Sequence, residues 1–165
     1  MSTADMVPTF SFEESDVAWV LDESSLDFLV ASLADADEVV IDLETTGLHE
    51  QAWEGGRMNS GVGARVVLAQ FTLPRSDSDQ PTNWVVPLSH PDSPFLGNWR
   101  AVLRRLARTI VEYRKPVIGQ NVKFDTRWVY ATTGIDLAPQ IAWDTRVSSH
   151  LLDENTSTSL KERAP

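Results

Sequence analysis

Two acidic side chains, Asp42 and Glu44, lie two positions apart at the end of the β-branched run Glu38–Leu43. Such a run predicts a strand buried on both faces, and residues two apart on a strand point to the same face. Two like charges about 4 Å apart repel by about 4 kcal/mol at an effective dielectric constant of about 20, and a divalent cation turns that repulsion into attraction. We therefore expect a cation here. Alternatively, the acidic residues only end the strand and cap the turn Thr45–Gly47.

A second group of polar residues, Gly119–Asp125, leads from a short predicted strand into a helix. Asn121 and Asp125 are four apart and can share one face of the first helical turns. An Asp125 carboxylate that faces Asp42 and Glu44 would complete an oxygen-rich cage, and Mg²⁺ and Mn²⁺ prefer oxygen ligands. The sequence thus predicts a metal site built from three acidic side chains that are far apart along the chain.

Hydrophobic periodicity predicts the elements that must bring these residues together. The order of strands and helices indicates an α/β domain with a mixed β-sheet flanked by helices. Residues 1–15 are predicted to be a loosely held lead-in, and residues 16–165 to form one domain. The expected strands are 17–21, 38–43, 65–73, 83–86 and 116–119, and the expected helices are 24–35 after a cap at 22–24, 99–113, 122–133 before Gly134, and one capped by Asp144 that runs to about 152.

The composition narrows the function classes. The formal charge of −10, from 14 Lys and Arg against 24 Asp and Glu, argues against a protein that binds nucleic acid through bulk positive charge. A metal-dependent nuclease nevertheless needs excess carboxylate at its centre, where divalent cations neutralise it and bridge to phosphate. The chain has no Cys, a Met-Ser-Thr-Ala-Asp start without a leader pattern, and no apolar stretch near the length of a membrane span. We expect a cytoplasmic protein with no membrane partner.

Four motifs follow one another along the chain: Asp42-Leu-Glu44 with Thr45 and Leu48, Gly119–Asp125, Trp143–Thr145 and Ser159–Arg163. In order and context they resemble the 3'→5' proofreading exonuclease domain of family A (polymerase I-like) DNA polymerases. The Asp-x-Glu pattern alone is weak, whereas Gly-Gln-Asn-x-Lys-Phe-Asp at this place is specific. The resemblance covers the chain from about residue 16 to its end, and long loops at 52–63 and 75–82 suggest a divergent, bacteriophage version.

The resemblance implies a ribonuclease H-like fold and the hydrolysis of the 3'-terminal phosphodiester of single-stranded DNA, which releases nucleoside monophosphates. Two divalent metal ions, Mg²⁺ or Mn²⁺, would carry the chemistry. Asp42 would bridge both ions, Glu44 would bind the ion on the nucleophile side, and Asp125 would serve the leaving-group side.

The resemblance also implies residues that contact the DNA substrate. The backbone at Thr45 would contact the end nucleotide, Leu48 would wedge between the last bases, and Phe124 would pack against the nucleic acid or support the site. The remaining candidates surround Asp125 and are Gln120, Asn121, Lys123 and Arg127. For Lys123 and Arg127, a solvated helix face is an equal alternative to phosphate contact.

One departure from the family pattern sets a further expectation. Such enzymes carry a fourth Asp, with a Tyr or His nearby, on a later helix, and the capping box Ser159–Glu162 announces a helix start only three residues before Pro165. We therefore expect the domain to be incomplete at its C-terminal end, with the exonuclease remainder and a polymerase module downstream, and weak or no activity from residues 1–165 alone. Asp144 is interpreted as a helix cap and not as the missing acid.

Two other functions remain open at this point. The chain could be a non-catalytic DNA-binding or structural fragment of a split replicase, or an RNase D-like exonuclease that acts on RNA. Two further groups receive structural interpretations: the Arg residues at 100, 104 and 108 as a solvated helix face, and the Trp residues at 19, 84, 99, 128 and 143 as parts of the core.

Overall fold

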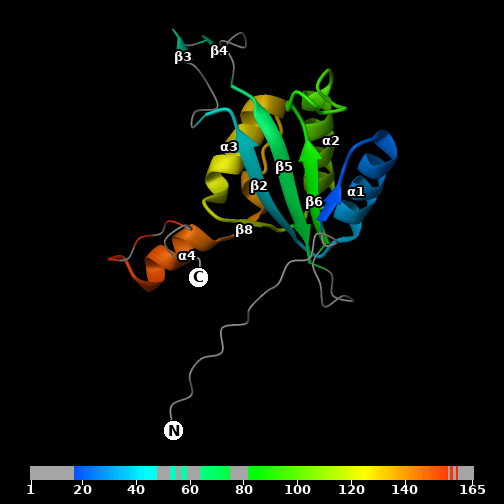
Figure 1. The fold of residues 1–165 in the computed structure, drawn as a ribbon. Coiled ribbons are helices and arrows are strands. Elements are labelled where there is room, and N and C mark those ends of the chain that lie inside the picture. Colours follow the sequence, from blue (N-terminus) through cyan, green and yellow to red (C-terminus); the bar gives the residue numbers. More distant parts are fainter. Residues whose placement is uncertain are drawn as a thin grey trace.

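The computed structural model of the chain describes residues 17–47, 53–54, 57–58, 64–74, 82–155, 157 and 159. Their centre is a six-stranded sheet in the order β1-β6-β5-β2-β7-β8, and a separate two-stranded sheet joins β3 to β4 (Figure 1). The elements are β1 (Val17–Trp19), α1 (Glu23–Asp35), β2 (Val39–Thr45), β3 (Trp53–Glu54), β4 (Arg57–Met58), β5 (Val66–Leu73), β6 (Thr82–Pro87), α2 (Trp99–Glu112), β7 (Val117–Gly119), α3 (Val122–Thr133), a 3₁₀ turn (Ala138–Gln140), β8 (Ile141–Asp144) and α4 (Thr145–Leu152).

The large sheet is mixed, as predicted. Strand β5 pairs antiparallel with both β2 and β6, whereas β1 with β6, β2 with β7 and β7 with β8 are parallel pairs. The structure adds β8, an edge strand that the sequence did not predict because none of its residues is fully buried, so it lacks a buried apolar pattern. It also adds the two-residue strands β3 and β4, which lie inside the predicted loop 52–63. The predicted helix start at Ser159–Glu162 and the 1–15 lead-in lie outside the described residues.

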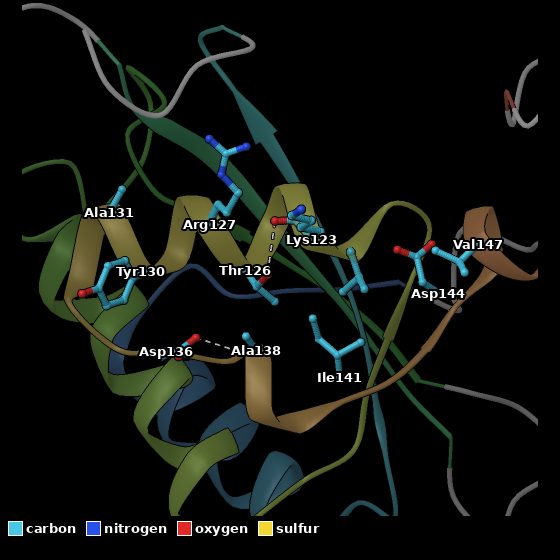
Figure 2. A pocket seen from close by; sticks show the side chains of 11 residues that line it. Lys123, Thr126, Arg127, Tyr130, Ala131, Asp136, Ala138, Ile141, Asp144 and Val147 are labelled. Carbon is cyan, nitrogen blue, oxygen red and sulfur yellow. Dashed lines mark hydrogen bonds between the residues drawn. The ribbon is translucent and has the colours of Figure 1, made fainter. Parts of the chain in front are cut away.

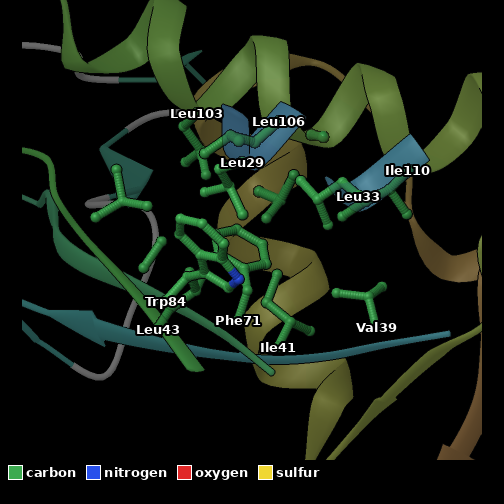
Figure 3. Packing of buried hydrophobic residues seen from close by; sticks show 14 of the residues in the cluster. Leu29, Leu33, Val39, Ile41, Leu43, Phe71, Trp84, Leu103, Leu106 and Ile110 are labelled. Carbon is green, nitrogen blue, oxygen red and sulfur yellow. The ribbon is translucent and has the colours of Figure 1, made fainter. Parts of the chain in front are cut away.

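The hydrophobic core lies between the sheet and the helices and includes buried residues of α1, α2 and α3; Figure 3 shows its part under α1 and α2. A strand exposes alternate residues to opposite faces, so Val39, Ile41 and Leu43 of β2 all point into this core, where each is at most 5% exposed. Burying one such side chain contributes about 1.5–3 kcal/mol. The partners drawn with them are Leu29 and Leu33 of α1, Leu103, Leu106 and Ile110 of α2, Phe71 and Trp84.

The other face of β2 corrects the prediction of a strand buried on both sides. Val40 is half-buried, and Asp42 and Glu44 are exposed. The apolar residues of the run lie on the core face of β2 and, at Val40, near the start of its other face. The later residues of that other face, Asp42 and Glu44, are exposed to solvent. This open position is where the two carboxylates stand.

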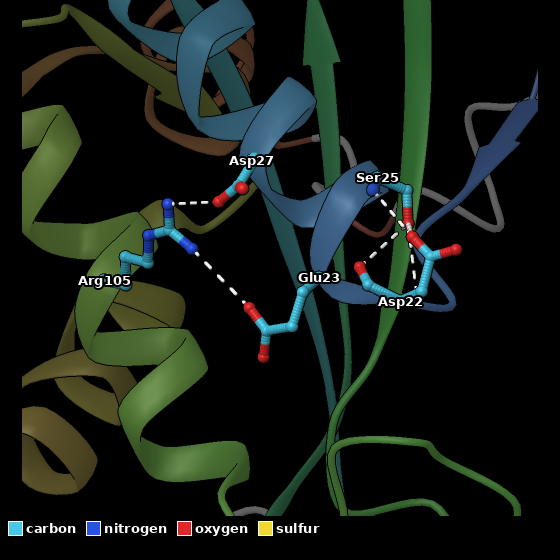
Figure 4. Close-up of polar contacts among 5 residues, drawn as sticks. All are labelled: Asp22, Glu23, Ser25, Asp27 and Arg105. Carbon is cyan, nitrogen blue, oxygen red and sulfur yellow. Dashed lines mark hydrogen bonds and ion pairs between the residues drawn. The ribbon is translucent and has the colours of Figure 1, made fainter.

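Helix α1 begins at a capping box and is tied to α2 by charge (Figure 4). The Asp22 carboxylate accepts a hydrogen bond of 2.7 Å from the Ser25 N–H, and the Ser25 hydroxyl oxygen accepts one of 3.1 Å from the Asp22 N–H. From α2, the Arg105 guanidinium lies 2.6 Å from an Asp27 oxygen and 3.8 Å from a Glu23 oxygen. These contacts link α1 to α2.

Two of the five Trp residues predicted to be in the core are not buried. Trp19 is 55% exposed and Trp143 is 56% exposed. They lie on β1 and β8, the two outermost strands of the sheet, where a neighbouring strand is present on one side only. The other three, at positions 84, 99 and 128, are buried as predicted.

The predicted solvated face of α2 is confirmed, since all three arginines are exposed, and one of them also makes a contact that was not predicted. Arg108 is exposed, and exposed Arg100 places its guanidinium 4.4 Å from the centre of the Trp99 ring. Arg104 also donates a hydrogen bond of 3.1 Å from Nε to the Thr133 carbonyl at the end of α3. Arg104 is thus a tie between α2 and α3. No helix within the described residues is long and apolar enough to cross a membrane.

Candidate functional site

The candidate site forms where β7 ends beside β2. Strand β7 pairs with β2 at Val39 and Val40 only, and the chain then turns into α3. Further along β2, the Leu43 N–H donates a hydrogen bond of 3.0 Å to Oδ1 of Asp125, which comes from the first turn of α3. A buried N–H needs an acceptor, and the side chain of Asp125 takes the place of a strand here. Asp125 therefore lies beside the backbone that separates Asp42 from Glu44.

Burial and charge raise the pKa of Asp125 from 3.8 to about 7. The residue is 3% exposed, so loss of water is the largest cause, and the charge of Asp42 is the second. The hydrogen bond from Leu43 opposes the rise, and Asp144 adds slightly to it. Loss of water also raises the pKa of Asp42, although that residue stays exposed overall. The charge of Asp42 therefore disfavours the charged form of Asp125.

The donor chemistry fits a hard divalent cation at Asp42 and Asp125, because both offer carboxylate oxygens and each would gain from a neutralising charge. Glu44 stands on the same exposed face of β2 as Asp42. Within the ranges that the structure describes, no three His, Cys, Asp or Glu side chains are gathered closely enough to hold a metal ion. Two of the three predicted ligands thus come together, and Glu44 is near in sequence but not part of one tight cluster.

The turn between β7 and α3 explains two residues of the motif. A Cβ at Gly119 would lie 3.0 Å from the Ile41 carbonyl oxygen and 3.1 Å from the Val122 side chain, so only glycine fits without a shift. Asn121 has the left-handed conformation, with φ 58° and ψ 39°, and precedes the helix as its cap residue. Asn adopts this conformation more readily than most residues. Asn121 therefore has a structural role in the turn. This role is separate from its predicted contact with substrate, which stays a prediction.

Asp144 takes the predicted role of helix cap and one more. Its Oδ1 accepts a hydrogen bond of 2.9 Å from the Arg146 N–H, which caps α4. The same oxygen accepts another of 2.9 Å from the Asn121 N–H. Sequence reasoning missed this second contact because the residues are far apart along the chain.

The other predicted substrate contacts have mixed surroundings. The Thr45 hydroxyl donates to the Gly47 carbonyl at 2.7 Å, which holds the turn after β2. Phe124 is half-buried, with its ring centre 6.2 Å from that of Trp128, a contact that supports α3. Leu48 lies outside the described residues.

Lys123 and Arg127 are exposed on α3, beside a hollow of about 600 Å³ between α3 and the segment from the 3₁₀ turn to α4 (Figure 2). Gln120, also predicted to contact substrate, is half-buried at the end of β7. Most of the lining is apolar, and Tyr130 adds an aromatic ring that sequence reasoning missed. Its spacing of three from Arg127 was the available signal, because residues three or four apart share a helix face.

The chain is similar to known proteins in sequence and in fold. A model of the 3'-5' exonuclease family matches residues 17–162. DNA polymerase I of Pseudomonas aeruginosa is 28% identical over 150 residues, which are 87% of this chain but only 14% of that protein.

Among solved structures, the catalytic core of Rrp6 from Trypanosoma brucei has a TM-score of 0.57 at 17% identity, over 87% of this chain and 32% of that one. The Mg²⁺- and Mn²⁺-bound form of S. pombe Pop2p has a TM-score of 0.57 at 11% identity, over 90% and 81% of the two chains. The RNase domain of yeast Pop2 has a TM-score of 0.56 at 13% identity, over 94% and 78%.

These structural likenesses confirm the predicted ribonuclease H-like fold, and at such identities they show the fold alone. The expected bacteriophage origin stays a prediction. The family match spans all of the described residues, including β2, α3 and the contact between Asp125 and Leu43. The chain therefore belongs to the 3'-5' exonuclease family.

Proposed function

We propose that the chain is the proofreading unit of a DNA polymerase and hydrolyses the 3'-terminal phosphodiester of single-stranded DNA. The observation that carries the proposal is the hydrogen bond from Leu43 to Asp125, which holds the Asp125 carboxylate at the backbone between Asp42 and Glu44 in a member of the 3'-5' exonuclease family. The choice of DNA rests on the similarity to a DNA polymerase I. The released product would be a nucleoside monophosphate.

We propose two divalent cations, Mg²⁺ or Mn²⁺, as cofactors, in line with the metals bound to S. pombe Pop2p. When bound, they supply the activation of the attacking water and the stabilisation of the departing 3' oxygen. Asp42 would contact both, Glu44 would serve the nucleophile side and Asp125 the leaving-group side. Their negative charges would hold the cations, and the low exposure of Asp125 would keep its contact away from competing water.

The substrate would lie along the start of α3. Lys123 and Arg127 are exposed one turn apart, so both can reach phosphates of one strand. The whole chain has a net charge of −10, and bound cations would offset the negative charge close to the site. The other proposed contacts are with the end nucleotide and its neighbour, at Thr45, Leu48, Gln120, Asn121 and Phe124.

The chain spans 14% of the length of its DNA polymerase I relative. On this ground we propose that a polymerase module and the rest of the exonuclease domain, with a fourth carboxylate, work with residues 1–165. The location would be the cytoplasm. Hydrolysis by residues 1–165 alone is then expected to be slow.

Binding of Mn²⁺ tests the proposal without any need for turnover. Mn²⁺ is titrated into the wild type, Asp42→Ala and Asp37→Ala, and free Mn²⁺ is followed by electron paramagnetic resonance. Asp37 is exposed and on the loop before β2, so its variant is the matched control. Asp42→Ala should weaken binding by at least about tenfold, a loss that even outer-shell changes produce, and the control should bind as the wild type does. Equal binding by all three proteins would refute the metal site.

A hydrolysis assay tests the reaction and the substrate. A 5'-labelled single-stranded DNA and an RNA of the same sequence are incubated with Mn²⁺ and each protein, and products are separated by length. The proposal expects DNA to shorten from its 3' end one nucleotide at a time, and Asp42→Ala to stop this. Shortening of RNA alone would favour an RNase D-like enzyme. The assay is repeated after adding the segments of the polymerase relative that residues 1–165 lack. If the proteins then bind Mn²⁺ and DNA but hydrolyse nothing, the result would favour a non-catalytic fragment.

A further inference from the structure

Asp144 makes a contact that a helix cap does not need. Its Oδ1 receives the N–H of Arg146, the capping contact of α4, and also the N–H of Asn121, each at 2.9 Å. Asn121 precedes α3, and 23 residues separate it from Asp144. One carboxylate oxygen thus joins the start of α4 to the start of α3. Figure 2 shows Asp144 across from α3, at the end of the hollow.

The segment that Asp144 holds is strained. Asn121 has φ 58° and ψ 39°, a left-handed conformation that costs most residues other than glycine about 1–2 kcal/mol and costs Asn less. Such conformations persist where the surroundings hold them. A hydrogen bond to a charged acceptor contributes about 1.5–3 kcal/mol, which is enough to offset that strain. Asn121 has no such bond from its own side chain, since it makes no side-chain cap contact with α3.

The strained turn sets the direction of α3. Asp125 lies four residues after Asn121, which is about one turn and about 6 Å of helix. Because this single helical turn is short and stiff, a change in the backbone at Asn121 would displace the Asp125 carboxyl by a similar amount. The hydrogen bond from Leu43 to Asp125 is 3.0 Å long, so a shift of about 1 Å would break it. The position of Asp125 therefore depends on the turn that Asp144 holds.

We propose that Asp144 is a positioning residue of the site: by binding the Asn121 N–H it fixes the left-handed turn that aims α3 and holds Asp125 against β2. This inference rests on the proposed function for its consequence, since Asp125 is there a metal ligand. Its structural part, the dependence of the Asp125–Leu43 contact on Asp144, stands apart from any activity.

The test compares Asp144→Ala, which removes the acceptor, with Asp144→Asn, which keeps an oxygen acceptor without the charge. The first readout is hydrogen exchange of the Leu43 amide by NMR on the metal-free chain, because that N–H is protected by Asp125. Asp144→Ala should speed this exchange by about tenfold or more, the equivalent of about 1.4 kcal/mol, and Asp144→Asn should stay within about threefold of wild type.

A matched control separates positioning from capping. Leu151→Gly weakens α4 by about 0.8 kcal/mol, comparable to the loss of a cap, at a residue of α4 that is 80% exposed. It should leave Leu43 exchange unchanged. If Leu151→Gly and Asp144→Ala speed the exchange equally, Asp144 acts only as a cap and the inference is overturned.

A second background keeps the test decisive if Asp144→Ala folds poorly. Glycine adopts the left-handed conformation without strain, so in an Asn121→Gly protein the turn depends less on the hydrogen bond to Asp144. There, Asp144→Ala should speed Leu43 exchange by no more than about threefold, and a tenfold effect in both backgrounds would overturn the inference.

Metal affinity is the last readout and distinguishes the two proposals. With Mn²⁺, Asp144→Ala should bind about tenfold more weakly than wild type, and Asp144→Asn should recover most of the affinity. If the wild type binds no Mn²⁺ but Asp144→Ala still speeds hydrogen exchange of the Leu43 amide, the proposed function fails and the positioning role stands. If Asp144→Ala leaves hydrogen exchange of the Leu43 amide unchanged, the positioning role fails, whether or not Mn²⁺ affinity changes.

Discussion

The Asp125→Asn substitution should stabilise the metal-free protein above pH 7. The pKa of Asp125 is about 7 in the folded chain, against an ordinary 3.8. Between these values the folded protein keeps a proton that the unfolded chain has lost, so its free energy of unfolding falls as pH rises from about 4 to 7. At about 1.4 kcal/mol for each pH unit, the wild type carries a penalty of about 4 kcal/mol above pH 7. Local relaxation and entry of water would reduce this to about 1–4 kcal/mol.

The variant lacks this charge and keeps an oxygen that can accept from Leu43. Its stability advantage over wild type should therefore be about 1–4 kcal/mol at pH 8 and only about a quarter of that at pH 4.5. Urea unfolding in a chelating buffer, at several pH values and with equal m-values, measures the difference. Asp37→Asn, at an exposed site, is the control and should follow the wild type. Parallel curves for wild type and Asp125→Asn from pH 4.5 to 8 would show that Asp125 is not buried beside Asp42.

Metal should reverse the order of stability: at a Mn²⁺ concentration about 100 times its dissociation constant, the wild type should gain about 2.7 kcal/mol and Asp125→Asn much less, as read from thermal unfolding. Gly119→Ala should cost about 1–3 kcal/mol in urea unfolding because the new Cβ would stand 3.0 Å from the Ile41 carbonyl, and a loss near zero would contradict that close approach. Arg105→Ala should cost less than about 1 kcal/mol because its ion pair with Asp27 is exposed, and thermal unfolding that shifts by more than a few degrees would contradict this.

Local signals predicted most elements to within one or two residues. Helix α1 begins at Glu23 after a cap at Asp22, as its Ser and Asp residues indicated, and α3 ends before Gly134, which has φ 76°. These ends depend on side chains that are neighbours along the chain, so the sequence contains what decides them. Strand β8 and the exposure of Trp143 depend on the edge of the sheet, which has no local signal.

By itself, the sequence determined the chemistry available to this protein: two carboxylates on one face of β2 and a third in the motif that starts α3. It determined these because strand alternation and helical spacing act over a few residues. Only the tertiary structure decided that β7 stops early enough for Asp125 to reach the Leu43 N–H, and that Asp144 accepts from Asn121. Both contacts join residues more than 20 positions apart, and the packing of the sheet against its helices, not any local preference, brings such residues within hydrogen-bonding distance.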